Sequence, residues 1–214
     1  MRVVIISGGK VEDAFVLEWL QKNKYDLLMA ADSGMEFLHR NQITPDVIAG
    51  DFDSVGQEAY GYFAEKVPEI IRLNPMKDDT DTEFVIREAI GRGATSIMVF
   101  GGTGTRLDHV LGNVHLLGIG LATDVEIILM DSHNRIRMIS KELVIDKESQ
   151  YGDFVSILPF AGDAKGVTLE GFKYPLENAT IESFCSLGIS NEIVEPQARV
   201  SVEDGVLLVI ESRD

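Results

Sequence analysis

The sequence is poor in cysteine, in positive charge and in long apolar runs, and each shortage argues against a class of protein. Cys185 is the only cysteine, so no internal disulfide can form. The formal net charge of -16 leaves no basic face for a nucleic-acid backbone. No apolar run reaches membrane-spanning length, and the run before Gly8 is too short for a signal-peptide core. We therefore expect a cytoplasmic protein with no nucleic-acid or membrane partner.

What the chain does contain is enough apolar material for a substantial core. Its 214 residues are 45% hydrophobic, which suits one large domain or two modest ones. The negative charge also sets a condition on any ligand, because it repels a free polyphosphate. A bound phosphate therefore needs a metal cation or backbone N–H groups to reverse the local sign.

Short apolar, β-branched runs alternate with amphipathic stretches through the first two thirds of the chain. The expected strands are residues 2–7, 26–31, 46–50, 70–73, 96–100 and 125–130, and the expected helices are 11–23, 35–40, 56–66, 80–91 and 107–117. This alternation predicts an α/β fold with a doubly wound, mainly parallel, Rossmann-like sheet.

The pattern changes near Ile136. Apolar runs at 154–158, 166–169 and 206–210 are short and are separated by glycine, proline, aspartate and asparagine. Such spacing predicts a smaller all-β domain. We therefore expect two domains, residues 1–137 and residues 138–214.

Polar segments follow the expected strands of the first domain. Asp32-Ser33-Gly34 follows the second strand, 50–54 follows the third, 77–81 precedes a helix, and 101–108 follows the strand at 96–100. Open α/β sheets bind ligands beyond the carboxyl ends of their strands, so these segments are expected to meet at one crevice.

The acidic residues of these segments suggest a magnesium site. If the segment around Phe52 is extended, Asp51 and Asp53 project to the same side. Magnesium often uses one or two carboxylates together with substrate phosphates. Asp81, in the first turn of the expected helix, can face the same crevice, whereas Asp79 is expected to act as an N-cap. Thr80 and Glu83 also form a capping-box pattern at the start of this helix. The alternative is a set of solvated turns and caps.

The glycine-rich segment 101–108 offers unobstructed backbone N–H groups at a helix N-terminus, with Arg106 as a fork-shaped phosphate donor. It lacks the ending of a Walker P-loop, so an ordinary strand-to-helix turn remains an alternative. Ser7-Gly8-Gly9-Lys10 is a weaker signal of the same kind. His109 and His115 lack metal-ligand spacing, and we expect packing or surface roles for them.

Five motifs in order make the sequence recognisable. They are ADSG (31–34), PDVIAGDFDS (45–54), DDTDTE (78–83), GGTGTRLDH (101–109) and GISNE (188–192). Together they resemble the thiamine pyrophosphokinase family, from the first strand to the C-terminus. The resemblance implies a nucleotide-binding α/β domain, a sandwich-like C-terminal domain, and a homodimer with thiamine bound at the subunit interface. It also implies magnesium-dependent transfer of diphosphate from ATP to the thiamine hydroxyl, with release of AMP.

The resemblance also suggests roles by position. It implies catalytic roles for Asp51, Asp53, Asp81, Arg106 and Asp108; magnesium binding by Asp51, Asp53 and Asp81; ATP binding by Asp32, Ser33, Lys77, Thr80, Gly101, Gly102, Thr103, Gly104 and Arg106; and thiamine binding by Asp108, Ser190 and Asn191.

Two other classes of function remain open at this stage. Asp51-Phe52-Asp53-Ser54-Val55 after an apolar strand also resembles the nucleophile motif of haloacid-dehalogenase phosphatases, in which Asp51 would form an aspartyl phosphate. Those enzymes carry the motif on their first strand, whereas here it follows the third. The other alternative is a non-catalytic nucleotide-binding module, which would bind without turnover.

Overall fold

The chain folds into two compact units, Met1–Ser132 and His133–Asp214. The structure is a computed structural model that describes residues 1–53, 55–74, 76, 78–104 and 106–214. Within these residues, no helix has both the length and the apolar character needed to cross a membrane.

The first unit alternates strands and helices. In chain order its elements are β1 (Arg2–Ile6), α1 (Asp13–Lys22), β2 (Leu27–Ala31), α2 (Gly34–Arg40), β3 (Val47–Gly50), α3 (Gln57–Ala64), β4 (Glu69–Arg72), α4 (Asp81–Gly91), β5 (Ser96–Phe100), α5 (Leu107–Thr123) and β6 (Glu126–Met130). The predicted alternation is therefore confirmed.

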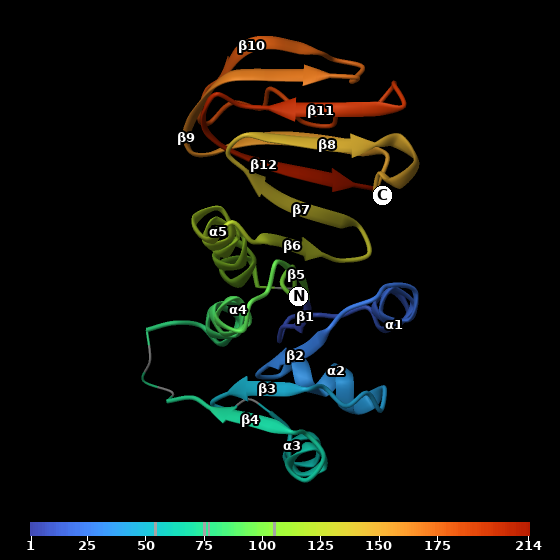
Figure 1. Ribbon diagram of the computed structural model, residues 1–214, viewed down its shortest axis with the longest axis vertical. Coiled ribbons are helices and arrows are strands. Elements are labelled where there is room, and N and C mark those ends of the chain that lie inside the picture. Colours follow the sequence, from blue (N-terminus) through green and yellow to red (C-terminus); the bar gives the residue numbers. More distant parts are fainter. Residues whose placement is uncertain (54, 75, 77, 105) are drawn as a thin grey trace. The chain divides into compact units, whose positions relative to one another are not determined.

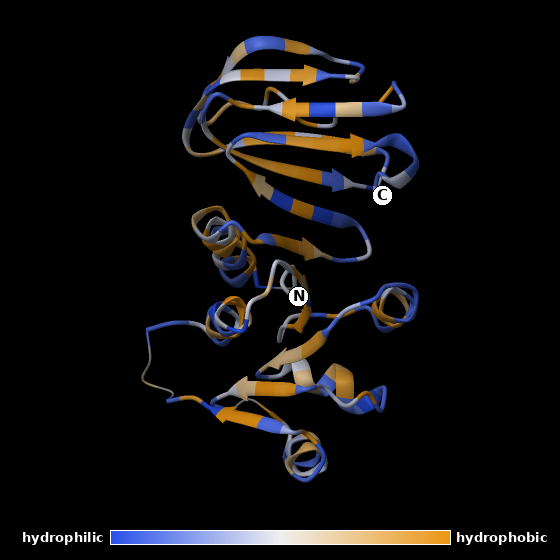
Figure 2. Cartoon of the chain, in the orientation of Figure 1, coloured by the Kyte–Doolittle hydropathy of each residue, from blue (hydrophilic) through white to orange (hydrophobic). Residues whose placement is uncertain are grey.

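The six strands of the first unit form a parallel sheet in the order β4-β3-β2-β1-β5-β6. Helices α4 and α5 lie on one side of this sheet, and α1 and α3 lie on the other (Figure 1). Because helices cover both faces, the strands are apolar along most of their length, as the orange colouring in Figure 2 shows. In β1, for example, residues Val3 to Ile6 are all buried.

The strand order changes direction at β1. From β1 the chain builds outward through β2, β3 and β4, and then returns to place β5 on the opposite side of β1. A crevice forms at such a point because the connections leaving the two neighbouring strands diverge to opposite faces of the sheet. The carboxyl ends of β1 and β5 therefore mark the expected ligand site.

Helix α5 is longer than the sequence predicted. It was expected to end at Leu117, before the two glycines of its last turns, but it continues to Thr123. Gly120 is required there, because a Cβ at this position would lie 2.4 Å from the carbonyl oxygen of Val125 as the chain turns back. The glycine thus allows a close approach of the backbone and does not end the helix.

The second unit consists of strands and one short 3-10 helix. Its elements are β7 (Asn134–Ile139), β8 (Glu142–Asp146), the 3-10 helix Lys147–Ser149, β9 (Phe154–Glu170), β10 (Leu176–Ile181), β11 (Gln197–Ser201) and β12 (Asp204–Ser212). The strands pair antiparallel in the order β7-β12-β9-β11-β8, and β10 also pairs with β9.

Strand β9 is the central strand of this unit because its two halves pair with different strands. Its first half pairs with β12, and its second half pairs with β10 and β11. Between them, Ala161 and Gly162 have φ angles of 61° and 140°, a conformation that interrupts the pleat and redirects the strand. Side chains such as Ile157 and Val167, from the two halves of β9, therefore enter one apolar core.

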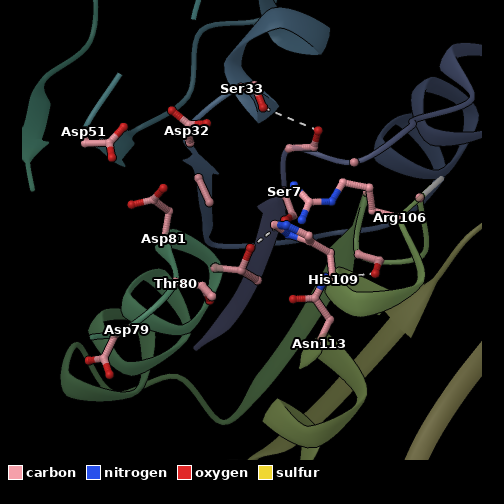
Figure 3. A pocket seen from close by; sticks show the side chains of 17 residues that line it. Ser7, Asp32, Ser33, Asp51, Asp79, Thr80, Asp81, Arg106, His109 and Asn113 are labelled. Carbon is pink, nitrogen blue, oxygen red and sulfur yellow. Dashed lines mark hydrogen bonds between the residues drawn. The ribbon is translucent and has the colours of Figure 1, made fainter. Parts of the chain in front are cut away.

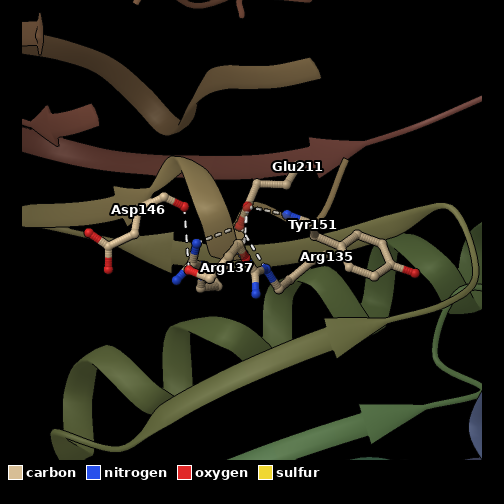
Figure 4. A network of polar contacts seen from close by, with 6 residues as sticks. Arg135, Arg137, Asp146, Tyr151 and Glu211 are labelled. Atoms are coloured by element: carbon tan, nitrogen blue, oxygen red, sulfur yellow. Dashed lines mark hydrogen bonds and ion pairs between the residues drawn. The ribbon is translucent and has the colours of Figure 1, made fainter. Parts of the chain in front are cut away.

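A buried ionic network lies on β7 and β12 of the second unit (Figure 4). The carboxylate of Glu211 has no exposed surface and accepts hydrogen bonds from Arg135 Nε at 2.7 Å, Arg137 Nη2 at 2.5 Å and the Tyr151 backbone N–H at 2.9 Å. Burial alone raises the pKa of this carboxyl. The hydrogen bonds from Arg135 and the charge of Arg137 outweigh burial, so the pKa lies below its usual 4.5.

We expect Glu211→Gln to lower the free energy of unfolding at pH 7 by on the order of 3 kcal/mol, because it leaves two arginines without their buried counter-charge. A lowered pKa stabilises the fold above the unfolded-state value and loses that effect as pH falls. The difference between wild type and variant should therefore shrink below pH about 4.5. Urea unfolding at pH 7 and pH 4 measures both effects.

The matched control is Glu142→Gln, which removes an exposed ion pair with Arg199. Because both side chains are about half exposed, the expected loss is at most about 1 kcal/mol. Equal losses in the two variants would contradict the importance assigned to the buried network.

Candidate active site

A cleft of about 450 Å³ lies at the carboxyl ends of the strands in the first unit (Figure 3). Its lining comes from the segments after β1, β2, β3 and β5 and from the first turns of α4 and α5. The lining residues are Ser7, Gly8, Gly9, Ala31, Asp32, Ser33, Asp51, Asp79, Thr80, Asp81, Thr82, Gly101, Gly102, Gly104, Arg106, His109 and Asn113. The predicted convergence of strand-end segments on one crevice is confirmed.

One side of the cleft carries three carboxylates, which we call the acidic cluster. Asp32 follows β2, Asp51 follows β3, and Asp81 begins α4. One oxygen atom from each of the three lies within 4.8 Å of the others. That spacing and the hard oxygen donors fit a divalent cation such as magnesium, which would offset the repulsion among the three charges. Asp32 adopts a left-handed backbone with φ 46°, a conformation that aspartate tolerates better than most residues.

Asp53 lies next to the acidic cluster but outside it. Its backbone N–H donates to Asp51 Oδ1 at 3.1 Å, and Phe52 between them has φ 63°. The segment is therefore a turn and not extended, so the extended geometry expected for Asp51 and Asp53 is wrong, although their two carboxylates do interact. The charges of Asp51, Asp32 and Asp81 raise the pKa of Asp53, with Asp51 as the largest cause. Metal binding by Asp53 stays a prediction.

The first turn of α4 is fixed by a side-chain cap. Thr80 is the N-cap, and its hydroxyl accepts a hydrogen bond from the Glu83 backbone N–H at 3.2 Å. The expectation that Asp79 caps this helix is wrong, because Asp79 precedes the cap and lines the cleft. Asp81 lies in the first turn and lines the cleft as predicted.

On the other side of the cleft, two glycine turns pack backbone against backbone. The Gly9 N–H donates to the Gly101 carbonyl at 3.0 Å. Gly101 has φ 72°, and a Cβ there would lie 2.4 Å from the Ser7 carbonyl oxygen, so no other residue fits. The buried amide of Asn113 donates to the Gly102 carbonyl at 2.8 Å and holds the second turn in place. Backbone N–H groups at such a turn before a helix can bind an anion.

Arg106 and His109 extend the lining of the cleft along α5 (Figure 3). The Arg106 guanidinium pairs with Asp108 Oδ2 at 2.5 Å, and both side chains are about two-thirds exposed. Hydrogen bonding from Arg106 lowers the pKa of Asp108 to about 2. Asp108 lines a neighbouring hollow of about 330 Å³ together with Thr80 and His109. A carboxylate with so low a pKa is a weak base.

Comparison with known proteins identifies the family. Residues 19–129 match the family model described as "Thiamin pyrophosphokinase, catalytic domain", and residues 141–207 match "Thiamin pyrophosphokinase, vitamin B1 binding domain". The chain belongs to the thiamin pyrophosphokinase family. This confirms the family predicted from the five sequence motifs.

Individual members of the family align with this chain over nearly its whole length. The thiamine pyrophosphokinase of Bacillus subtilis (strain 168) is 34% identical over 193 residues, 90% of each chain. The crystal structure of thiamine pyrophosphokinase from Bacillus subtilis matches with a TM-score of 0.90 at 32% identity and 100% coverage of both chains. The crystal structure of thiamin pyrophosphokinase from Geobacillus thermodenitrificans matches with a TM-score of 0.86 at 30% identity. The match covers 100% of this chain and 98% of that chain.

Two residues that the family resemblance assigned to thiamine lie in the second unit. Asn191 is buried, and its side chain bonds the backbone of Tyr174 through both its oxygen, at 3.0 Å, and its nitrogen, at 2.8 Å. Ser190 is exposed, and its backbone N–H donates to Ser156 Oγ at 3.0 Å. In this unit Asn191 therefore holds two loop segments together, and contact of either residue with thiamine stays a prediction.

Three further residues were predicted to bind ATP from the thiamin pyrophosphokinase motifs, and among the described residues only one of them is observed to line the cleft. Ser33 lines the cleft, and its hydroxyl lies 3.4 Å from the Gly8 carbonyl oxygen. Thr103 is not among the described residues that line the cleft. Lys77 lies outside the described residues. The ATP-binding roles assigned to all three stay predictions.

Sequence reasoning missed several residues of the cleft. His109 was expected to have a packing or surface role; it is exposed and also lines the cleft, as does Asn113. The signal was available, because Arg106, His109 and Asn113 follow at spacings of three and four, which put them on one face of a helix. Ser7 belongs to the weaker glycine-rich signal at residues 7–10 and Thr82 to the motif at residues 78–83, but no local sequence signal predicts their contact with each other.

Proposed function

We propose that this chain is a thiamine diphosphokinase that transfers the β,γ-diphosphate of ATP to the hydroxyl of thiamine and releases AMP. The observation that carries the proposal is the cleft itself. It sets three carboxylates against two glycine turns and an arginine in a chain of the thiamin pyrophosphokinase family. Carboxylates that hold a cation and N–H groups that bind phosphate are the two requirements of phosphoryl-type transfer.

Each side of the cleft has a distinct role in this proposal. Asp32, Asp51 and Asp81 would hold Mg²⁺, with Asp53 beside them as the further ligand that the sequence motif suggests. The cation supplies electrostatic polarisation of the transferred group. The N–H groups of residues 101–104 bind and orient its oxygen atoms, and Arg106 adds a positive charge with two parallel donors.

Removal of the proton from the thiamine hydroxyl requires little general-base catalysis by the protein. Because the transition state of phosphoryl-type transfer is loose, the attacking oxygen needs little help from a base. Asp108, with a pKa of about 2, accepts a proton poorly while Arg106 is bound to it. We therefore assign Asp108 to holding Arg106, and its contact with thiamine rests on the family resemblance alone.

The proposal also assigns a role to each of the two expected domains. Residues 1–137 would be a Rossmann-like, doubly wound nucleotide-binding domain, supported by the parallel sheet and its reversed strand order. Residues 138–214 would be a sandwich-like domain for thiamine binding and dimerisation, supported by the match to the vitamin B1 binding domain. A cytoplasmic homodimer with thiamine at the subunit interface, contacted by Ser190 and Asn191, completes the proposal.

Purified protein with ATP, Mg²⁺ and thiamine is expected to form AMP and thiamine diphosphate in equal amounts, and chromatography of the products measures both. Omission of thiamine or addition of EDTA should stop AMP release. Release of inorganic phosphate without thiamine would instead indicate a phosphatase with Asp51 as nucleophile. Nucleotide binding without AMP release would indicate a non-catalytic binding module. Either result would overturn the proposal.

A further inference from the structure

Two largely buried residues that line the cleft, Ser7 and Thr82, meet through their hydroxyl groups. Ser7 Oγ and Thr82 Oγ1 lie 2.6 Å apart, a short hydrogen bond between side chains that are only 4% and 8% exposed. We call them the hydroxyl pair. Ser7 directly follows β1, and Thr82 lies in the first turn of α4. The bond therefore joins two elements that are 75 positions apart in the sequence.

The hydroxyl pair directly adjoins functional residues on both of its elements. Thr82 is the residue after Asp81 of the acidic cluster, and Ser7 is the residue before Gly8 of the first glycine turn. Ser7 is itself fixed, because its backbone N–H donates to the Phe100 carbonyl at 2.8 Å. The hydrogen bond between Thr82 and this fixed point restrains the rotation of the first turn of α4, and with it the direction of the Asp81 side chain.

Packing of α4 on the sheet does not depend on this bond. Val85, Ile86 and Ala89 of the same helix are all fully buried, and the Thr80 cap closes its N-terminus. Apolar contacts of this kind are non-directional, so they hold the helix against the sheet without fixing its first turn closely. A satisfied polar contact at the same interface adds the directional constraint that the apolar contacts lack.

We propose that the Ser7–Thr82 hydroxyl pair is a positioning device that directs the Asp81 carboxylate toward Asp32 and Asp51 for binding of a divalent cation. The inference rests on the proposed function, since it concerns the metal site of that reaction. Residues that orient a metal ligand change affinity for the metal when they are removed, even though they do not contact it.

The test uses Thr82→Val, which keeps the shape of the side chain and removes the hydroxyl, and Thr82→Ser, which keeps the hydroxyl. Binding of Mn²⁺ to the full chain without nucleotide, followed by electron paramagnetic resonance, is the main measurement. We expect Thr82→Val to weaken Mn²⁺ binding about tenfold, the lower end of the effect of removing an outer partner of a metal ligand. Thr82→Ser should stay within about twofold of wild type.

Two further variants separate positioning from a general loss of stability. Ile86→Val removes one buried methyl group from the same helix without touching the hydroxyl pair, and it should lower the melting temperature while leaving Mn²⁺ binding unchanged. Ser7→Ala removes the other hydroxyl and should weaken Mn²⁺ binding as Thr82→Val does. It also provides the test if Thr82→Val does not fold.

The outcomes separate this inference from the proposed function. Wild-type protein that binds Mn²⁺, with Thr82→Val or Ser7→Ala binding it equally well, overturns the positioning role alone. A loss in Ile86→Val as large as in Thr82→Val also overturns it, because stability would then explain both. Wild-type protein that binds Mn²⁺ in a manner dependent on the hydroxyl pair but releases no AMP overturns the proposed function and leaves the positioning role standing.

Discussion

Asp51→Asn is expected to lower kcat/KM for thiamine diphosphate formation by roughly 10²–10³-fold, because it weakens the hold on the cation that would stabilise the transferred group electrostatically. The substitution removes a charge from the acidic cluster while keeping the size of the side chain. The melting temperature should stay at or above the wild-type value, because the three carboxylates repel one another when no cation is bound. Product chromatography and thermal unfolding measure the two effects. Asp53→Asn, measured in parallel, decides whether Asp53 also contributes to the site.

The control for Asp51→Asn is Asp204→Asn, the same chemical change at a side chain that is about three-quarters exposed and lies 3.8 Å from Lys165 in the second unit. It should leave both turnover and stability unchanged. Full activity of Asp51→Asn would contradict the assignment of the acidic cluster. A large fall in its melting temperature would instead indicate that Asp51 stabilises the fold.

Arg106→Lys is expected to reduce kcat/KM by about 10²-fold or more, because a lysine cannot present two parallel donors to a phosphate group. Stability should change little. The ion pair between Arg106 and Asp108 is largely exposed, and such pairs contribute at most about 1 kcal/mol. Kinetics at saturating ATP and at saturating thiamine would show which substrate loses affinity.

Arg199→Lys is the matched control for Arg106→Lys, because Arg199 also forms an exposed ion pair with an acidic residue, Glu142. Turnover in this variant should equal that of wild type. If Arg106→Lys kept full activity, the guanidinium would not be part of the phosphate site, and the glycine turns alone would have to bind the transferred group.

The order of elements in the first unit could be predicted from the sequence because each has a local signal. β1 and β5 are short apolar runs, and α4 begins with Thr80 followed by Glu83 at the spacing of a helix cap. The convergence of strand ends followed from the general rule for parallel sheets. The residues named for the cleft on this basis, such as Asp81 and Arg106, do line it.

What could not be predicted depends on contacts between distant segments or on unusual backbone conformations. Asp32 joins Asp51 and Asp81 because β2 and β3 are neighbours and because its backbone turns left-handed. The turn at Phe52 likewise replaces the extended segment that alternation suggested. The contact of Ser7 with Thr82 exists because α4 packs against the sheet beside β1, which brings together two residues that are 75 positions apart. None of these has a signal within a short window of sequence.

The proposed site is tested most directly by locating a divalent cation in crystals grown with Mn²⁺ and a non-hydrolysable ATP analogue. We expect an anomalous-scattering peak within bonding distance of oxygen atoms of Asp32, Asp51 and Asp81, with the phosphate groups against residues 101–104 and Arg106. A cation bound elsewhere, or phosphate groups on the far side of the sheet from these residues, would contradict it.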